Sequence, residues 1–165
     1  MLENGGKNIH DCGIIEVTSD FTCGNQDKHQ PKNVVTFSTN GCFFSRDDNN
    51  ATIVFDFKDN LKINIENYSL KSICSGGSYG CHLRNWAIDV SDDGNEWTTI
   101  HNVVNCPDMN KSCTIKTFAV YANDLLTRYC RLRVTGENWP QNESNEIHYN
   151  IGIFQIEFYG YLYKK

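Results

Sequence analysis

Apolar and polar side chains alternate along short stretches of this chain, in the pattern of strands that bury one face. In 129–135, for example, apolar positions alternate with Arg131 and Arg133. No long stretch repeats with the helical period of 3.6 residues, although 122–127 could form one helical turn. The clearest strand-like runs are 51–57, 68–73, 86–91, 117–121, 129–135 and 151–161.

These runs, separated by turn residues, predict a single all-β sandwich over 14–163. A Gly- and Asn-rich lead-in, 1–13, precedes it. The Asp-Asp-Gly-Asn segment at 92–95 predicts a tight turn, because Gly and Asn accept positive φ. Trp86 and Trp97 fall within strand patterns and are expected to lie in the core.

Successive antiparallel strands alternate in direction, so alternate connections are expected at the same end of the sandwich. The longer connections then share one end, and they carry the aromatic residues Phe43, Phe44, Tyr79, Trp139 and Tyr149 and the histidines His82, His101 and His148. The shorter, charged ones share the other. Long loops gathered at one end of a rigid sandwich favour a binding module. The predicted long-loop end has 38–50, 74–83, 101–113 and 136–150; the other end has 58–67, 92–96 and 122–128.

Composition narrows the classes of function. The net charge of −5 over 165 residues argues against nucleic-acid binding, which needs a basic face. No run of 18 apolar residues occurs, and the opening residues lack an apolar signal core. The chain is therefore expected to be intracellular or part of a longer protein, and the cytoplasm is the favoured location.

Eight cysteines leave the redox compartment open. Cys74 and Cys81 have the same spacing as Cys106 and Cys113, so either two bridges clip two loops or the thiols are free. The four Asn-x-Ser/Thr sequons do not decide between these readings, because a chain this rich in Asn, Ser and Thr forms sequons by chance.

Several segments resemble discoidin domains, also called coagulation factor 5/8 type C domains. The stronger matches are 82–97 (HLRNWAIDVSDDGNEW), 129–138 (YCRLRVTGEN) and 153–160 (IFQIEFYG), in the family's order. The resemblance covers 14–161 and implies a galactose-binding-like jelly roll whose end loops bind ligands. It is strongest to an intracellular, protist branch found C-terminal to BTB-type assembly modules.

Two departures from the family pattern matter. Sugar-binding members often hold a structural calcium with a loop aspartate and a glutamate on the last strand; Glu157 matches the glutamate. Thr36 stands where the aspartate would be, so we expect no cofactor and treat Glu157 as a weak calcium candidate. Acidic side chains in the long loops also argue against binding to anionic membranes.

No catalytic motif is present, so a non-enzymatic module is favoured. An exposed Trp139 could stack on a sugar or anchor a peptide, or fold back over its loop. Arg46 could grip a ligand or pair with neighbouring aspartates, and of Phe43 and Phe44 one is expected to be buried. The candidate ligand-binding residues are Phe44, Arg46, Tyr79, His82, Asn138, Trp139, Asn142 and Asn145.

The favoured function is a monomeric recognition module at the C-terminal end of a larger protein. Its ligand is a protein, a peptide or a glycan, with a slight preference for protein or peptide. The alternative is a secreted or surface lectin-like adhesin with disulfide-clipped loops. Counting free thiols separates the two.

Overall fold

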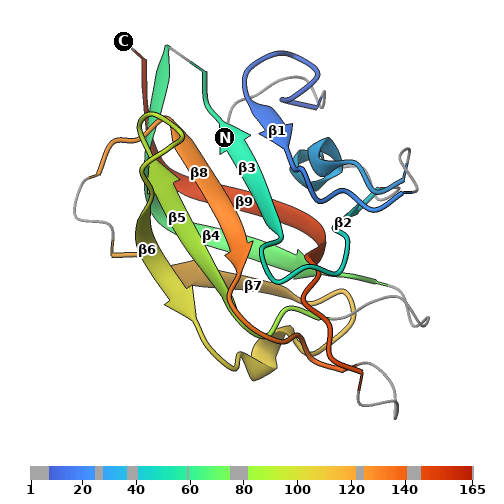
Figure 1. Cartoon of the computed structure of the whole chain (residues 1–165). Coiled ribbons are helices and arrows are strands. Elements are labelled where there is room, and N and C mark those ends of the chain that lie inside the picture. Colours follow the sequence, from blue (N-terminus) through green and yellow to red (C-terminus); the bar gives the residue numbers. More distant parts are fainter. Residues whose placement is uncertain are drawn as a thin grey trace.

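The computed structural model describes residues 8–24, 28–36, 41–58, 60–74, 82–121, 125–140 and 146–164. The described ranges contain short strands, two long strands and two 3-10 helices (Figure 1). In chain order they are β1 (Glu16–Thr18), η1 (Pro31–Val35), β2 (Phe43–Phe44), β3 (Thr52–Asp56), β4 (Leu61–Ser72), β5 (Trp86–Ser91), β6 (Thr98–Val103), η2 (Pro107–Met109), β7 (Ile115–Ala119), β8 (Tyr129–Val134) and β9 (Gly152–Lys164).

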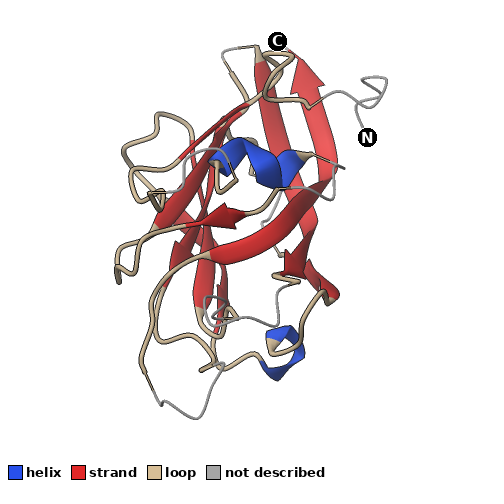
Figure 2. Ribbon diagram, turned by 90° about the vertical axis from the view of Figure 1, so that its right-hand side faces the viewer, coloured by secondary structure: helices blue, strands red, loops and turns tan. Residues whose placement is uncertain are grey.

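The strands form two antiparallel sheets that pack face to face. One sheet has the order β1-β3-β8-β5-β6 and the other β2-β9-β4-β7. In Figure 2 the two layers are seen from the side, with the strands running along the length of the molecule. The predicted all-β sandwich is confirmed. Within the described ranges, no helix has both the length and the apolar character that crossing a bilayer requires.

Strand bounds follow the alternation where the alternation is regular. β3, β5 and β8 coincide with the predicted strands to within one residue at each end. β4 instead begins at Leu61, so most of 58–67, predicted as a connection, is strand. The pattern was hidden because a bulge between Ile65 and Asn67 resets the alternation. β6 likewise extends to Val103, into the connection predicted from 101.

Gly160 lies opposite this bulge. Its φ is +149°, and a Cβ there would lie 2.0 Å from the backbone oxygen of Asn64. Only glycine fits such a close approach, so Gly160 allows the long β4–β9 ladder to pass the bulge without a break.

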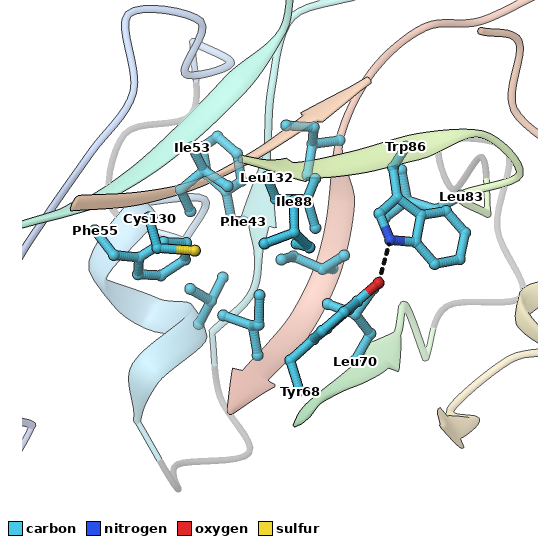
Figure 3. Packing of buried hydrophobic residues seen from close by; sticks show 14 of the residues in the cluster. Phe43, Ile53, Phe55, Tyr68, Leu70, Leu83, Trp86, Ile88, Cys130 and Leu132 are labelled. Atoms are coloured by element: carbon cyan, nitrogen blue, oxygen red, sulfur yellow. Dashed lines mark hydrogen bonds between the residues drawn. The ribbon is translucent and has the colours of Figure 1, made fainter. Parts of the chain in front are cut away.

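The core lies between the sheets and uses the side chains that the alternation predicted. Ile53, Phe55 and Leu132 are fully buried, as Figure 3 shows. The indole N–H of Trp86 donates to the Tyr68 hydroxyl oxygen at 2.9 Å. That hydroxyl lies 2.8 Å from Nδ1 of His101. Because the phenol oxygen already accepts from Trp86, its proton is free to bond the neutral imidazole, and the buried polar groups satisfy one another.

The outer face of the five-stranded sheet carries a buried charge. Asp89 on β5 is 1% exposed and accepts from Nε of Arg131 at 2.8 Å and Nε of Arg133 at 2.9 Å. The predicted outward direction of these arginines is confirmed. Trp97 also lies on this face, half-exposed, with the Arg131 guanidinium 4.2 Å from its ring centre, so its predicted core position is wrong.

One disulfide joins Cys74 to Cys113, with 4.4 Å between their Cα atoms. This bond overturns both alternatives left open by the sequence, the pairing of Cys74 with Cys81 and of Cys106 with Cys113 and the set of eight free thiols. β7 runs antiparallel to β4, so Cys74, just after the end of β4, lies beside Cys113, just before the start of β7. Cys106 is a buried free thiol, and Cys81 lies outside the described residues.

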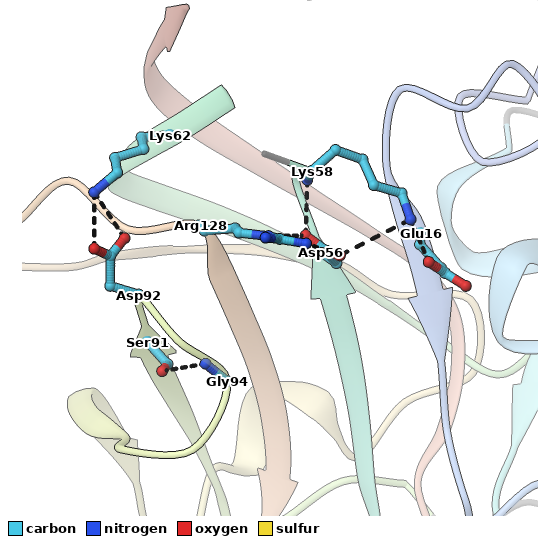
Figure 4. A network of polar contacts seen from close by, with 8 residues as sticks. All are labelled: Glu16, Asp56, Lys58, Lys62, Ser91, Asp92, Gly94 and Arg128. Carbon is cyan, nitrogen blue, oxygen red and sulfur yellow. Dashed lines mark hydrogen bonds and ion pairs between the residues drawn. The ribbon is translucent and has the colours of Figure 1, made fainter. Parts of the chain in front are cut away.

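The connections divide between the two ends as the strand directions require. Pairing of Trp86 with Val134 and of Asp56 with Tyr129 places the start of β5 and the end of β8 together, away from the end of β3. At the short-loop end, ion pairs join neighbouring elements (Figure 4). Lys62 on β4 pairs with Asp92 in the 92–96 turn, Arg128 pairs with Asp56, and Lys58 contacts Glu16.

Two smaller expectations concerned the lead-in and a helical turn at 122–127. In the predicted lead-in, Ile9 packs against the core and the Asn8 side-chain amide donates to the Lys32 carbonyl at 3.0 Å. Part of the predicted helical turn, 122–124, lies outside the described residues, and Thr127 forms a β-bridge with Ile63.

Candidate functional site

An open pocket of about 440 Å³ lies at the long-loop end of the five-stranded sheet. It forms where the chain enters β5 and leaves β6 and β8. We call it the end-loop pocket. The residues that line it are Arg84, Asn85, Asn102, Val104, Thr135, Gly136, Glu137 and Tyr149.

Asn85 ties two of the pocket's loops together. Its Nδ2 donates to the carbonyl of Glu137 at 2.7 Å, and its Oδ1 accepts from the backbone N–H of Asn105 at 2.9 Å. Gly136 makes this approach possible, since a Cβ there would lie only 3.2 Å from the Asn85 side chain. A single amide thus fixes both loops relative to β5.

Arg84 is held in a defined orientation at the rim. Its Nε donates to Oδ1 of Asn105 at 2.8 Å, and its guanidinium carbon lies 4.5 Å from the centre of the Trp139 ring. Trp139 is fixed in turn, because its indole N–H donates to the Cys106 carbonyl at 2.8 Å. Among the described residues, none accepts a hydrogen bond from the two terminal amino groups of Arg84. These donors are therefore available to a ligand.

Tyr149 is positioned by an acidic side chain from another loop. Oδ1 of Asp47 accepts from the backbone N–H of Tyr149 at 2.7 Å, and Oδ2 lies 2.8 Å from Nδ1 of His148. The 41–51 connection thereby holds the 146–151 connection, and with it the Tyr149 ring, against the pocket.

The rim combines opposite charges with a small apolar area. Arg84 offers only donors, the Glu137 carboxylate offers only acceptors, and Asn102 offers both. Val104 is 69% exposed beside them. This set suits a ligand with many hydroxyl groups and some apolar surface, because hydroxyls both donate and accept.

The predicted residues Trp139, Asn138 and His82 lie under or beside this pocket rather than on its surface. Trp139 is half-buried beneath Arg84. Asn138 is 4% exposed and donates from Nδ2 to the Asn150 carbonyl. His82 is 6% exposed and burial lowers its pKa, against the opposing effect of hydrogen bonds to Asn110 and Ile73. All three support the loops, and the burial of Asn138 and His82 argues against the predicted direct contact with a ligand.

Phe44 and Arg46 lie elsewhere. Phe44 is 9% exposed, with its ring centre 5.1 Å from that of His29, and Phe43 is fully buried. This burial argues against the predicted presentation of Phe44 to a ligand, because both faces of β2 are covered. Arg46 is exposed but donates to the Asp20 carbonyl at 2.9 Å and lies 5.9 Å from the Phe21 ring centre. Of the remaining candidates, Tyr79, Asn142 and Asn145 lie outside the described residues.

Glu157 stands on the outward face of β9, opposite Ser69, and its Oε2 accepts from the Tyr159 hydroxyl at 2.8 Å. Across the described ranges, no cluster of three or more His, Cys, Asp or Glu side chains could hold a metal ion. The loop segment 37–40 lies outside those ranges.

Most pocket residues were missed by the sequence-based reasoning. Arg84 and Asn85 lie inside the 82–97 segment that resembles discoidin domains, and Glu137 lies in the 129–138 segment. Their position directly before β5 and directly after β8 was the available signal, since strand ends of neighbouring strands meet at one rim.

No model of a known protein family matches the sequence, and no curated protein matches it either. Solved structures match in fold. CpGH89CBM32-5 from Clostridium perfringens, solved with GalNAc-β-1,3-galactose, superposes with a TM-score of 0.63 at 12% identity, covering 90% of this chain and 96% of that one.

Two further solved structures are similar. CBM32-3, from a family 31 glycoside hydrolase of C. perfringens, gives a TM-score of 0.63 at 15% identity, covering 92% and 94%. Chitosan-binding module 1, from a chitosanase/glucanase of Paenibacillus sp. IK-5, gives 0.61 at 13% identity, covering 89% and 96%. The chain therefore has the galactose-binding-like β-sandwich fold of family 32 carbohydrate-binding modules.

Proposed function

We propose that this chain is a non-catalytic module that binds an uncharged, hydroxyl-rich ligand, a carbohydrate, in the end-loop pocket. The observation that carries the proposal is the oriented Arg84 guanidinium in a pocket that the acidic Glu137 also lines. Their charges cancel, which disfavours a strongly anionic ligand such as a phospholipid head group. Their donors and acceptors complement a sugar.

The comparisons support this assignment, because the similar structures include carbohydrate-binding modules, two of them in larger enzymes of glycan breakdown. The resemblance to discoidin domains is compatible with the shared fold. We include in the proposal that the chain is the recognition part of a larger protein. Association with an upstream BTB-type module in a protist protein remains part of the hypothesis.

A peptide ligand is the second candidate. The exposed side chain of Val104 in the pocket lining favours it, because it adds apolar contact that a sugar uses less. The disulfide between Cys74 and Cys113 bears on location, since such bonds persist in oxidising compartments. It favours the secreted, adhesin-like form of the same carbohydrate-binding function.

A glycan array with the whole chain, followed by calorimetry on any hit, tests the proposal. Arg84→Ala and Trp139→Ala should each weaken binding by about 2–4 kcal/mol, because one removes the oriented donors and the other their support. Arg46→Ala is the matched control and should leave affinity unchanged, since Arg46 lies against Phe21 and Asp20.

Two outcomes would contradict the proposal. An array without hits at high micromolar concentration, or an Arg84→Ala variant that binds as well as the wild type, rejects a carbohydrate at this pocket. Binding from a peptide library that Arg84→Ala abolishes would support the second candidate instead.

A further inference from the structure

The last strand has a free edge at the short-loop end. β4 pairs with one edge of β9 as far as Lys164, whereas β2 occupies the other edge only at Gly152 and Ile153. Every residue from 159 to 164 is exposed. Figure 1 shows this part of β9 running beside the start of β4 to the end of the chain. In the described part of the chain, no strand pairs with this edge.

This edge lacks most of the devices that normally block strand pairing. Proteins protect edges with proline, bulges, inward-pointing charges or very short strands. β9 has no proline and spans 13 residues. The bulge inserts Glu66 into β4, on the paired side, so β9 keeps a continuous alternation past Gly160. Lys164 is the one charged residue in 159–164.

One face of this segment is aromatic, and the other carries an apolar residue between Gly160 and Lys164. Tyr159, Tyr161 and Tyr163 alternate along one face and are 40–59% exposed. On the other face, Leu162 is 39% exposed and pairs with Ile63. Ile63 also bridges to Thr127, which places the exposed Leu126 close by. An exposed apolar area beside an open edge marks an interaction surface.

When two copies of this segment pair antiparallel, the tyrosines of one copy lie opposite the tyrosines of the other. The segment reads Tyr-Gly-Tyr-Leu-Tyr, so the tyrosines are symmetric about Tyr161. In an antiparallel pair centred on Tyr161, Tyr159 of one copy faces Tyr163 of the other, and Tyr161 faces itself. Directly opposed aromatic residues stabilise such ladders, and a two-fold interface requires this self-complementarity.

We propose that residues 158–164 of β9 pair with the same segment of a second copy, joining two four-stranded sheets into one continuous sheet around a two-fold axis at Tyr161. This dimer differs from the monomer expected from the sequence, because edge accessibility depends on strand order. It does not depend on the ligand of the end-loop pocket.

Sedimentation equilibrium of the whole chain, from low to high micromolar concentration, tests the pairing. The wild type should approach twice the monomer mass. Tyr161→Lys should be monomeric throughout, because the two introduced ammonium groups would face each other across the axis. Tyr121→Lys, at an 88% exposed site away from the edge, is the matched control and should still dimerise. Circular dichroism confirms that each variant folds.

A charge swap tests the register. Tyr159→Lys and Tyr163→Glu each remove aromatic pairs, whereas the double variant places opposite charges face to face at both symmetric positions. The double variant should therefore dimerise more tightly than Tyr159→Lys alone. A wild type that stays monomeric at the highest concentration, a dimer that survives Tyr161→Lys, or a double variant no tighter than Tyr159→Lys overturns the proposal.

Discussion

At the scale of the residue, a single buried carboxylate, Asp89, accepts hydrogen bonds from side chains of two neighbouring strands. Asp89 accepts hydrogen bonds from two arginines and from the Thr99 hydroxyl at 2.7 Å while almost fully buried. Burial by itself would raise the pKa of Asp89, but the hydrogen bonds from Arg133, Thr99 and Arg131 outweigh it and hold the pKa below its ordinary value. The charged carboxylate therefore orders the outer face of three strands.

Replacing Asp89 with asparagine should lower the free energy of unfolding by about 2–4 kcal/mol, because two arginines lose their charged partner. The arginines are partly exposed, which keeps the loss below that of a fully buried pair. Urea unfolding measures it. Asp108→Asn, which breaks a surface pair with Lys116, should shift the midpoint little. Equal shifts in both variants would contradict the assigned role of Asp89.

The candidate binding residues show what the sequence could not supply at this scale. Chemistry alone selected Phe44, His82 and Asn138, yet all three are buried. Type and loop position do not reveal which way a side chain turns. Trp139 was located in the correct loop, but its contact with Arg84 depends on two chain segments meeting in space. That contact orients Arg84, which lines the pocket.

At the scale of the element, regular alternation was enough to predict most strands. β3, β5 and β8 follow directly from one buried and one outer face. β4 and β9 were predicted too short because a bulge and exposed tyrosines break or mask the pattern. The disulfide partners could not follow from spacing, since strand pairing, and not sequence distance, sets which cysteines meet.

The bridge between Cys74 and Cys113 should stabilise the fold by closing a long chain segment. Because its ends are separated by 39 positions in the sequence, its loss is expected to cost about 3–4 kcal/mol in the loop-entropy description. Reductant should therefore lower the thermal midpoint of the wild type. It should have no such effect on the Cys74→Ala/Cys113→Ala double variant. A reductant effect of equal size in both proteins would show that another bond is responsible.

At the scale of the whole molecule, several half-buried or buried titratable groups make stability depend on pH in one direction. Burial lowers the pKa of His101, and the pKa of His29 is lowered by burial and by Lys28. The unfolded chain binds these protons more readily, so their contribution is complete above pH 6.5 and declines below it. Asp56 and Asp89, whose pKa values are lowered, add stability that is present above pH 3.8 and is lost as the pH falls further.

Thermal melts across this range should show a midpoint that falls steadily on acidification. Between about pH 7 and pH 5 the fall should be smaller for His101→Gln, because glutamine can accept from Tyr68 without taking up a proton. The wild-type and variant curves should converge in shape above this window. A midpoint that rises on acidification would contradict the assignment of neutral, buried imidazoles.

The end-loop pocket and the free edge of β9 lie at opposite ends of the sandwich. Two copies joined through β9 would point their pockets away from each other. Such a pair could cross-link two separate glycan-coated surfaces and agglutinate particles, but it could not grip neighbouring sugars on one short oligosaccharide. Its gain in avidity would therefore depend on how the ligand is displayed.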